Sequence, residues 1–370
     1  MSALVDGLSD EGPYVSDGID SRGGVFGVSR ERILRALSEA VGADVRAYVV
    51  EARHRVRGPA GYQGEKVIPT FDYTTQDGQC GSLTMLVKRF HTPGEREAAH
   101  YAHLHAHGAP IPELYLTDSD ATGREILFLE FLEAIVDLDP MVGFLSDPGA
   151  FGKFLTAAAR LNAIRPSPAY AKILRPMRLG STLAESRDSL ATLTELAAAG
   201  SLGEPLRGAV SDLAAGRLVA LSHRLEERLA EMPTGLVHND HDPANTGIRR
   251  ASGELLIFDL EFVGIGPRFT DVAGPLGATD AEQPRCLPRA VLAAEYLDAY
   301  AAAGGDAPSV DTLLDEARVL LMVGALRMLG WTIGRALDGV VDWTADREAG
   351  RREARAGLLA DLRRLADYAG

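Results

Sequence analysis

The pattern of the sequence changes part-way along this chain of 370 residues, and the change restricts the folds that it can adopt. In the first third, short runs rich in β-branched and aromatic residues alternate with glycine-containing turns, a pattern typical of strands. From Asp147 onward, long Ala/Leu/Arg segments with helical periodicity dominate, interrupted only over residues 235–274. One hydrophobic core seldom extends over so long a chain. We therefore predict an α+β protein with two lobes, the first built on an antiparallel sheet and the second mostly helical.

The first third predicts a sheet that carries one main helix. That helix is expected from about Pro93 to His107, because proline suits a first helical turn and Gly108 can end the helix. A shorter helix is expected over Ser29–Val41, where Ser29 can act as the N-cap. Strands are expected over residues 46–55, 66–75, 82–90, 114–117 and 124–131. Short links between the first three strands favour an antiparallel meander.

The remainder predicts a helical lobe. Helices are expected over residues 148–164, 181–199, 203–231, 288–303, 311–338 and 346–368. The resulting domain prediction has a flexible N-terminal arm over 1–24, a first lobe over 25–132 and a second lobe over 133–370. The last helix can pack on its own lobe or on a second subunit, so both a monomer and a homodimer are compatible with the sequence.

Composition narrows the class of partner. The net charge of −14 opposes binding to nucleic acid or to an anionic membrane surface. The two cysteines lie far apart and form no metal-binding or disulfide pattern. No apolar run approaches the length of a membrane span, and the N-terminus has no basic leader. These features predict a soluble cytoplasmic protein, and the acidic charge would suit a cationic substrate.

The most informative polar residues lie between two short apolar strands. Leu236-Val237 and Leu255–Phe258 flank a loop that contains Asp240 and Asn245, and Asp259 follows the second strand. Phosphoryl transfer needs a carboxylate to orient or deprotonate the attacking hydroxyl and hard oxygen ligands for Mg²⁺. Asp240 fits the first role, and Asn245 with Asp259 fits the second. The same three residues would fit turns, in which Asp and Asn are common.

These segments resemble a known family. The sequences HNDHDPAN (238–245) and FDLE (258–261) resemble the Brenner-type motif of the aminoglycoside phosphotransferase and choline kinase family. The resemblance implies a bilobal, protein-kinase-like fold and transfer of the γ-phosphoryl group of ATP to a small-molecule hydroxyl. It implies that Asp240 is the catalytic carboxylate and that Asn245 and Asp259 hold Mg²⁺.

The resemblance extends into the first lobe. Lys88 matches the strand lysine that holds the α- and β-phosphates, and Glu97 matches the helix glutamate that pairs with it. Glu95 is a competing partner for the lysine. The backbone near Glu130 and Leu132 resembles the linker that binds adenine. The nucleotide is predicted to be ATP, with GTP as the alternative.

Other positions either fit the family or depart from it. The segment 264–271 resembles a Gly/Pro-containing loop that ends in a structural aspartate, Asp271, and His238 is also predicted to be structural. Asn239 stands where relatives usually have glycine, and asparagine tolerates the left-handed backbone. The loop Arg57–Gly64 lacks the usual compact glycine pattern, so the grip on the nucleotide is expected to differ from that of relatives.

The acceptor is the least constrained partner. The family implies an acceptor site between the catalytic loop and the C-terminal helices. Candidates there are Glu261, Asp298, Arg327, Trp331, Asp338, Asp342 and Trp343. Acidic groups beside aromatic rings would suit an ammonium group. It is equally compatible with the sequence that Trp331 belongs to the core and that the acidic residues form a solvated face. An antibiotic such as an aminoglycoside, or another cationic hydroxylated metabolite, is the first choice.

Two other functions remain open from the sequence. The atypical Arg57–Gly64 loop fits a catalytically silent pseudokinase, whereas the complete Asp240, Asn245 and Asp259 set opposes it. A kinase acting on a protein is the second alternative, although the short segment between Asp259 and Asp271 leaves little room for an activation loop. The histidines of residues 91–107 also allow a metal site on one helical face.

Overall fold

The computed structural model describes most of the chain. The described residues are 19, 23–56, 64–93, 96–134, 145–177, 179–200, 204, 206–212, 215–249, 251–338 and 347–369. The predicted arm over 1–24 and the predicted loop over 57–64 therefore lie almost entirely outside the described residues.

The chain forms two compact units. Unit 1 contains Met1–Ile164, Asp240–Val263 and Ala302–Gly304. Unit 2 contains Arg165–Asn239, Gly264–Ala301 and Gly305–Gly370. The predicted catalytic loop thus belongs, from Asp240 onward, to the same unit as the N-terminal sheet.

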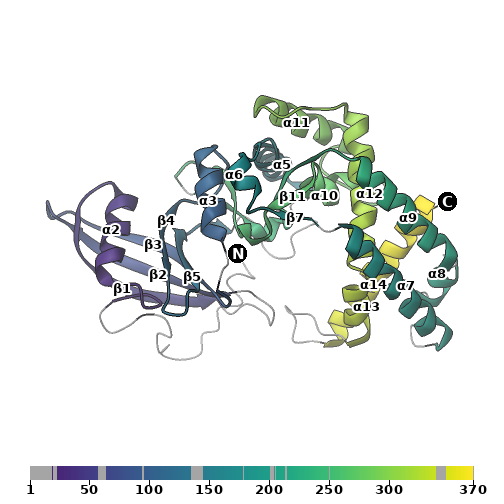
Figure 1. The fold of residues 1–370 in the computed structure, drawn as a ribbon, viewed down its shortest axis with the longest axis horizontal. Helices are drawn as coiled ribbons and strands as arrows, with labels where there is room; N and C mark the ends of the chain where they lie inside the picture. The colour runs from purple at the N-terminus through teal and green to yellow at the C-terminus, as the bar shows by residue number, and fades with distance from the viewer. Residues whose placement is uncertain are drawn as a thin grey trace. The chain divides into compact units, whose positions relative to one another are not determined.

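A five-stranded antiparallel sheet dominates the N-terminal part of unit 1 (Figure 1). Its strands, in the spatial order β1-β2-β3-β5-β4, are β1 (Val45–Val56), β2 (Gly64–Thr75), β3 (Cys80–Phe90), β5 (Glu125–Glu130) and β4 (Leu114–Ser119). The meander predicted for the first three strands is confirmed. Apolar side chains such as Phe71, Met85 and Phe128 are fully buried and form the core under this sheet.

Helix α2 (Arg30–Val41) confirms the short helix predicted from the sequence. The Ser29 side chain accepts a hydrogen bond from the Arg32 backbone N–H, and Gly42 ends the helix with a φ of 68°. The helix buries Ile33 and Leu37 and packs against β1 and β4.

Helix α3 (Glu97–Ala106) begins later than the predicted Pro93. Arg96, which precedes it, has a φ of −134° and provides no side-chain cap, so the helix starts at Glu97. This start places the Glu97 carboxylate in the first helical turn, where the helix dipole stabilises a negative charge.

The rest of unit 1 supports the loop that carries Asp240. Helix α5 (Pro148–Asn162) is capped by Asp147 and packs against β10. A second antiparallel sheet has the order β10-β9-β6 and is formed by β10 (Leu255–Ile257), β9 (Thr246–Ile248) and β6 (Glu133–Ala134). Two short 3₁₀ turns, η1 (Pro243–Asn245) and η2 (Leu260–Phe262), lie next to these strands in sequence.

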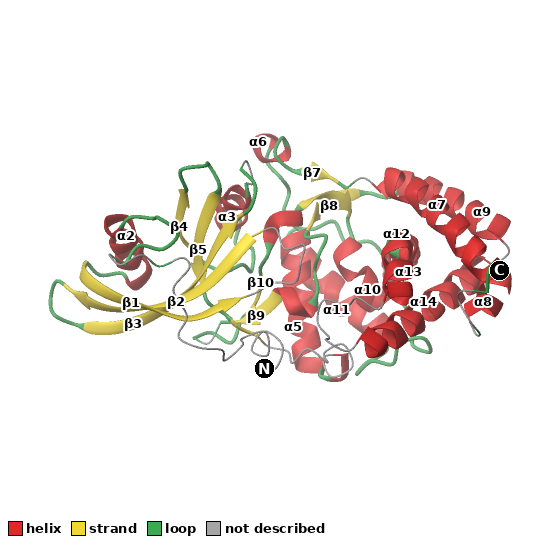
Figure 2. Cartoon of the chain, turned by 90° about the horizontal axis from the view of Figure 1, so that it is seen from below, coloured by secondary structure: helices red, strands yellow, loops and turns green. Residues whose placement is uncertain are grey.

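Unit 2 is mostly helical, as predicted (Figure 2). Its helices are α6 (Pro168–Ala171), α7 (Leu179–Ala198), α8 (Leu206–Asp212), α9 (Ala215–Glu231), α10 (Ala273–Gly277), α11 (Arg289–Ala302), α12 (Val310–Arg327), α13 (Leu329–Asp338) and α14 (Arg347–Ala369). A small sheet has the order β7-β11-β8 and is formed by β7 (Arg175–Pro176), β11 (Gly264–Pro267) and β8 (Thr234–Val237). The turn η3 (Thr270–Val272) leads into α10.

Two long helices predicted from the sequence each correspond to two helices of the structure. The segment predicted over 203–231 contains α8 and α9, and residues 213–214 between them lie outside the described residues. The segment predicted over 311–338 bends by 45° after Arg327 and forms α12 and α13. The bend coincides with glycines of low helix propensity, and Gly330 lies so close to Ser189 of α7 that a β-carbon there would collide with its hydroxyl.

No single helix in the described part of the chain is both long and apolar enough to cross a membrane. Helices α12 and α13 together reach the required length and apolar composition only as a bent pair.

Candidate active site

Lys88 and Glu97 form a buried ion pair within unit 1. The Lys88 Nζ lies 2.7 Å from Glu97 Oε2, and both side chains are almost completely buried. The other carboxylate oxygen, Oε1, accepts a hydrogen bond of 3.1 Å from the Leu260 backbone N–H. Glu97 is therefore the glutamate that meets Lys88, while the competing Glu95 lies outside the described residues.

Asp259 completes this arrangement from the far end of the sequence. It follows β10, and its φ of 64° is unusual for a residue other than glycine. Asp259 Oδ1 lies 2.5 Å from Lys88 Nζ, and Oδ2 lies 3.3 Å from Lys66 Nζ. Burial alone would raise the pKa of Asp259, but Lys88 and Lys66 outweigh it and lower the pKa to about 2. The carboxylate is thus ionised at neutral pH.

Two charged residues of this cluster were not predicted in this role. Glu261, an acceptor-site candidate from the sequence, instead has its Oε2 at 3.4 Å from Lys88 Nζ. Lys66 lies on β2 directly opposite Lys88 on β3, a relation that appears only when the strand register is known. Together with Lys88, Glu97 and Asp259, the residues Lys66 and Glu261 form what we call the charged cluster.

The carboxylates of the charged cluster keep Lys88 protonated. Burial alone would lower the pKa of Lys88, but the carboxylates of Glu97, Asp259 and Glu261 outweigh it and raise that pKa. A permanently charged ammonium group in a buried position can bind an anionic phosphate group without first taking up a proton.

Asp240 and Asn245 lie together in a more exposed part of unit 1. The Asn245 Nδ2 donates to the backbone carbonyl and to Oδ2 of Asp240, each at 2.8 Å. Asn245 closes the turn η1, and its own carbonyl accepts a 3.0 Å hydrogen bond from the Phe258 backbone N–H. This last bond ties the loop to the residue that precedes Asp259.

The donor set of these residues fits a magnesium ion. The amide nitrogen of Asn245 is used by Asp240, which leaves the amide oxygen as the atom able to bind a cation. Asp259 contributes an ionised carboxylate. Both are hard oxygen ligands of the kind that Mg²⁺ prefers. Glu97, Asp259 and Glu261 also bring carboxylate oxygens within 4.8 Å of one another, whereas the histidines described near α3 form no such group.

Asp271 fixes the start of the loop within unit 2. Its Oδ2 accepts from the His238 backbone N–H at 2.7 Å, and its Oδ1 accepts from the Asn239 N–H at 2.9 Å. His238 is fully buried, and Asn239 has the predicted left-handed backbone with a φ of 69°. Gly264 packs against the backbone carbonyl of Arg175 so closely that no β-carbon would fit there.

The residues predicted to bind adenine lie at the end of β5. Glu130 closes this strand, and its backbone N–H donates to the Glu113 carbonyl at 2.9 Å. Its side chain binds Arg249, with Glu130 Oε1 at 2.8 Å from Arg249 Nε. Leu132 follows the strand and is half-buried. The N–H and the side chain of Glu130 are therefore already bonded within unit 1.

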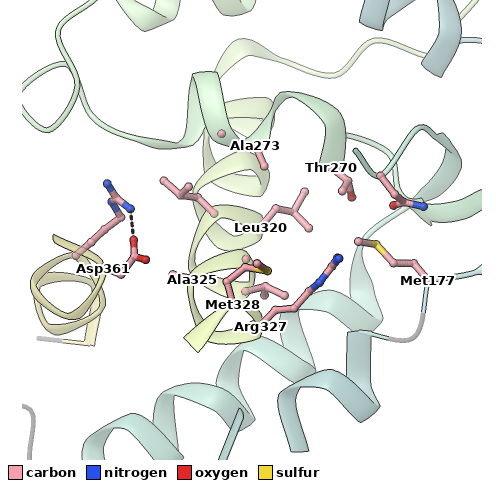
Figure 3. A pocket seen from close by; sticks show the side chains of 14 residues that line it. Met177, Thr270, Ala273, Leu320, Ala325, Arg327, Met328 and Asp361 are labelled. Atoms are coloured by element: carbon pink, nitrogen blue, oxygen red, sulfur yellow. Dashed lines mark hydrogen bonds and ion pairs between the residues drawn. The ribbon is translucent and has the colours of Figure 1, made fainter. Parts of the chain in front are cut away.

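Unit 2 contains a cavity of about 310 Å³, at the lower end of the range of about 300–1,000 Å³ usual for small-molecule sites. Its walls are largely apolar and include Leu320, Met328 and Met177. Figure 3 shows Arg327 with Met177 and Thr270 on one side of α12 and Asp361 on the other.

Charges in this cavity are unevenly balanced. Asp361 is paired with Arg364, whose Nη1 lies 2.9 Å from Asp361 Oδ1. Arg327 is exposed and forms no hydrogen bond or ion pair with any residue that the structure describes. Asn239 also lines the cavity, and Asp240 is the next residue in the chain.

The structure separates the remaining acceptor candidates. Asp298 is exposed on α11. Trp331 is 49% exposed, so it does not belong to the core, and the Arg335 guanidinium lies 4.1 Å from its ring centroid. The side chains of Asp338, Asp342 and Trp343 lie outside the described residues.

A family model described as the phosphotransferase enzyme family matches residues 70–311, well over half of the chain. The chain belongs to this phosphotransferase family. The matched segment includes Lys88, Glu97, Asp240, Asn245 and Asp259, and membership confirms the resemblance inferred from the sequence. The phosphotransferase therefore carries both the charged cluster and the loop with Asp240 and Asn245, and it has the fold that the resemblance implied.

Solved structures share the fold of this phosphotransferase. Choline kinase from Cryptosporidium parvum has a TM-score of 0.53 at 12% identity, over 86% of this chain and 90% of that chain. Ethanolamine kinase from Plasmodium vivax has a TM-score of 0.51 at 13% identity, over 85% of this chain and 81% of that chain. No curated protein matches by sequence.

Proposed function

We propose that this phosphotransferase transfers the γ-phosphoryl group of ATP to a hydroxyl group of a small molecule. The observation that carries the proposal is the coexistence, within unit 1, of the buried Lys88–Glu97–Asp259 contacts and the exposed Asp240–Asn245 pair. The first arrangement suits an anionic phosphate chain, and the second suits a hydroxyl group that arrives from solvent.

Asp240 is proposed to act on the acceptor. Its carboxylate orients the hydroxyl and takes its proton while the hydroxyl oxygen bonds to the γ-phosphorus. The bond from that phosphorus to the bridging oxygen breaks at the same time, and ADP leaves with the electron pair. Asn245 holds Asp240 in place through two hydrogen bonds of 2.8 Å. Because the acceptor oxygen attacks the γ-phosphorus directly, no covalent phospho-enzyme is needed.

Lys88 is proposed to hold the α- and β-phosphates, with Glu97 fixing its position. Asn245 and Asp259 would hold Mg²⁺, which when bound would offset phosphate charge and orient the triphosphate. The backbone near Glu130 and Leu132 is proposed to bind adenine.

The cavity in unit 2 supports a choice of acceptor. Its described walls are mostly apolar, and Arg327 is the charge there that has no described counter-ion. These features favour a compact, largely apolar hydroxyl compound with an anionic or hydrogen-bond-accepting group. The cationic acceptor predicted from the sequence, such as an aminoglycoside, would need carboxylates, and the one carboxylate in the described lining, Asp361, is already paired.

The test is an ADP-release assay with Mg·ATP and with Mg·GTP over a panel of acceptors. The panel would contain hydroxy acids, apolar hydroxylated antibiotics, aminoglycosides, amino-alcohols and sugars. Asp240→Asn is the test variant, and Asp188→Asn, at an exposed position on α7, is the matched control. We expect acceptor-dependent ADP release that only Asp240→Asn loses.

The alternatives give different results. Nucleotide binding without turnover on any acceptor would favour a pseudokinase. Transfer to a protein but to no small molecule would favour a protein kinase. Turnover with aminoglycosides and none with apolar or acidic acceptors would reject the reading of the cavity while keeping the kinase. A cytoplasmic location and a monomeric or homodimeric state remain predictions.

A further inference from the structure

Lys66 is a second lysine beside the proposed phosphate site, and no sequence motif points to it. It lies on β2 in direct register with Lys88 on β3, two adjacent strands of the sheet (Figure 1). Side chains at directly opposed positions of an antiparallel pair point to the same face. Both ammonium groups reach Asp259, with Lys88 Nζ at 2.5 Å from Oδ1 and Lys66 Nζ at 3.3 Å from Oδ2.

This placement is costly for a purely structural element. Like charges directly opposed in a sheet are destabilising, and bringing charges out of water is costly even when they are paired. Lys88 already supplies a cation to Asp259 and to Glu97. Lys66 is thus a second cation on a carboxylate that Lys88 already contacts, and it lies where an anion bound by Lys88 would come within its reach.

The two lysines differ in how firmly they are held. The Lys88 side chain is 4% exposed, whereas the Lys66 side chain is 17% exposed. Lys88 has Glu97 as a buried partner that does not depend on Asp259. Lys66 has a long flexible stem and greater access to solvent, so its ammonium group can turn from Asp259 to another anion.

We propose that Lys66 is a phosphate-binding residue that acts beside Lys88 on the nucleotide triphosphate. The proposal rests on the proposed kinase function. It also gives a reason for the unusual sequence of the Arg57–Gly64 loop, which joins β1 to β2 and lacks a compact glycine pattern. Backbone N–H groups of a glycine-rich loop are one way to hold phosphates; a lysine two residues beyond Gly64 is another.

The experiment measures nucleotide binding directly. Isothermal titration calorimetry with Mg·ATP, Mg·ADP and adenosine would compare the unsubstituted protein with Lys66→Met, Lys66→Arg and Lys88→Met. Lys172→Met, at an exposed lysine of unit 2, is the matched control. Melting temperatures of all variants would be recorded alongside.

We expect Lys66→Met to weaken Mg·ATP binding on the order of tenfold to a hundredfold, the usual effect of losing a charged hydrogen bond. Adenosine binding and the melting temperature should stay near those of the unsubstituted protein, and Lys66→Arg should retain most of the affinity. The control Lys172→Met should change none of these quantities.

Two results would overturn the inference. If Lys66→Met binds Mg·ATP as tightly as the unsubstituted protein while Lys88→Met does not, Lys66 has no phosphate role and the kinase proposal stands. If Lys66→Met melts at a clearly lower temperature, and if its affinities for adenosine and for Mg·ATP fall by the same factor, the lysine is structural. Failure of the unsubstituted protein to bind Mg·ATP would reject both the inference and the proposed function.

Discussion

Two groups of polar residues in unit 1 serve the same proposed reaction in opposite physical environments. In the charged cluster, Lys88 and Glu97 are buried and held by several short contacts. In the 240–245 loop, Asp240 is exposed and is held mainly by one neighbour, Asn245. The cluster must keep charges fixed for phosphate, whereas the loop must admit a hydroxyl from outside. Substitutions in the buried charged cluster should therefore lower the stability of the fold. Substitutions in the exposed loop should lower the reaction rate and leave the stability nearly unchanged.

Asp240→Asn tests most directly whether a substitution in the exposed loop lowers the rate without lowering the stability. Loss of a catalytic base typically costs about 10²- to 10⁴-fold in rate, so kcat should fall by that order. The melting temperature should hardly change, because the side chain is exposed and asparagine can still accept from Asn245. Steady-state kinetics and thermal melting would check this, and a large loss of stability with little loss of rate would contradict the comparison.

Lys88→Met tests the buried charged cluster, where a substitution should lower the stability of the fold. It leaves Glu97 buried without its cation, and removal of one partner from a buried ion pair typically costs about 3–5 kcal/mol. Urea denaturation would measure the loss. The double variant Lys88→Met/Glu97→Gln should recover part of it, because the uncompensated charge is then gone. A single-variant loss comparable to that of Lys172→Met would show that the pair contributes no stability.

Asp271→Ala tests whether the start of the loop is fixed from unit 2. The substitution leaves the backbone N–H groups of His238 and Asn239 without their acceptor. A buried unsatisfied donor typically costs about 1–3 kcal/mol, so a drop of that size is expected in urea denaturation. Asp271→Asn, which can still accept one of the two bonds, should lose less. Equal losses for the two variants would mean that the hydrogen bonds are not the cause.

The smallest effect should come from a more exposed ion pair in unit 2. Glu282 lies 2.7 Å from Arg318 Nη1. Burial would raise the pKa of Glu282, but hydrogen bonds from Arg318 and Thr279 outweigh it and lower the pKa from 4.5 to about 2. A lowered carboxylate pKa stabilises the folded state above the unfolded value and loses this effect as pH falls through the folded value.

The stability difference between the unsubstituted protein and Glu282→Gln should therefore be constant above about pH 5. It should shrink between pH 4.5 and about 2. Surface pairs contribute about 0–1 kcal/mol, well below the buried pair of Lys88. Urea denaturation at a series of pH values would check this, and an increase of the difference at low pH would give the wrong sign.

Local patterns were sufficient to predict much of this protein. Periodicity and turn residues predicted the five-stranded sheet, the Ser29-capped helix and the helical second part, because such features depend on neighbouring residues. The spacing of Asp240, Asn245 and Asp259 indicated the family, since it reflects one loop and one strand end. The division of the helix over 311–338 was not predicted. In the structure Gly330, close to the break, lies against Ser189, which is far away in sequence.

The sequence by itself determined the fold class, the family and the side chains with metal- and phosphate-binding chemistry. Only the tertiary structure brought Lys66 and Lys88 to the same carboxylate, 193 and 171 residues away from them along the chain. It also turned Glu261 toward the lysine and left Arg327 in a largely apolar cavity. Strand register and packing between distant segments decide such contacts, because charge interactions depend on distance in space and not on separation in sequence.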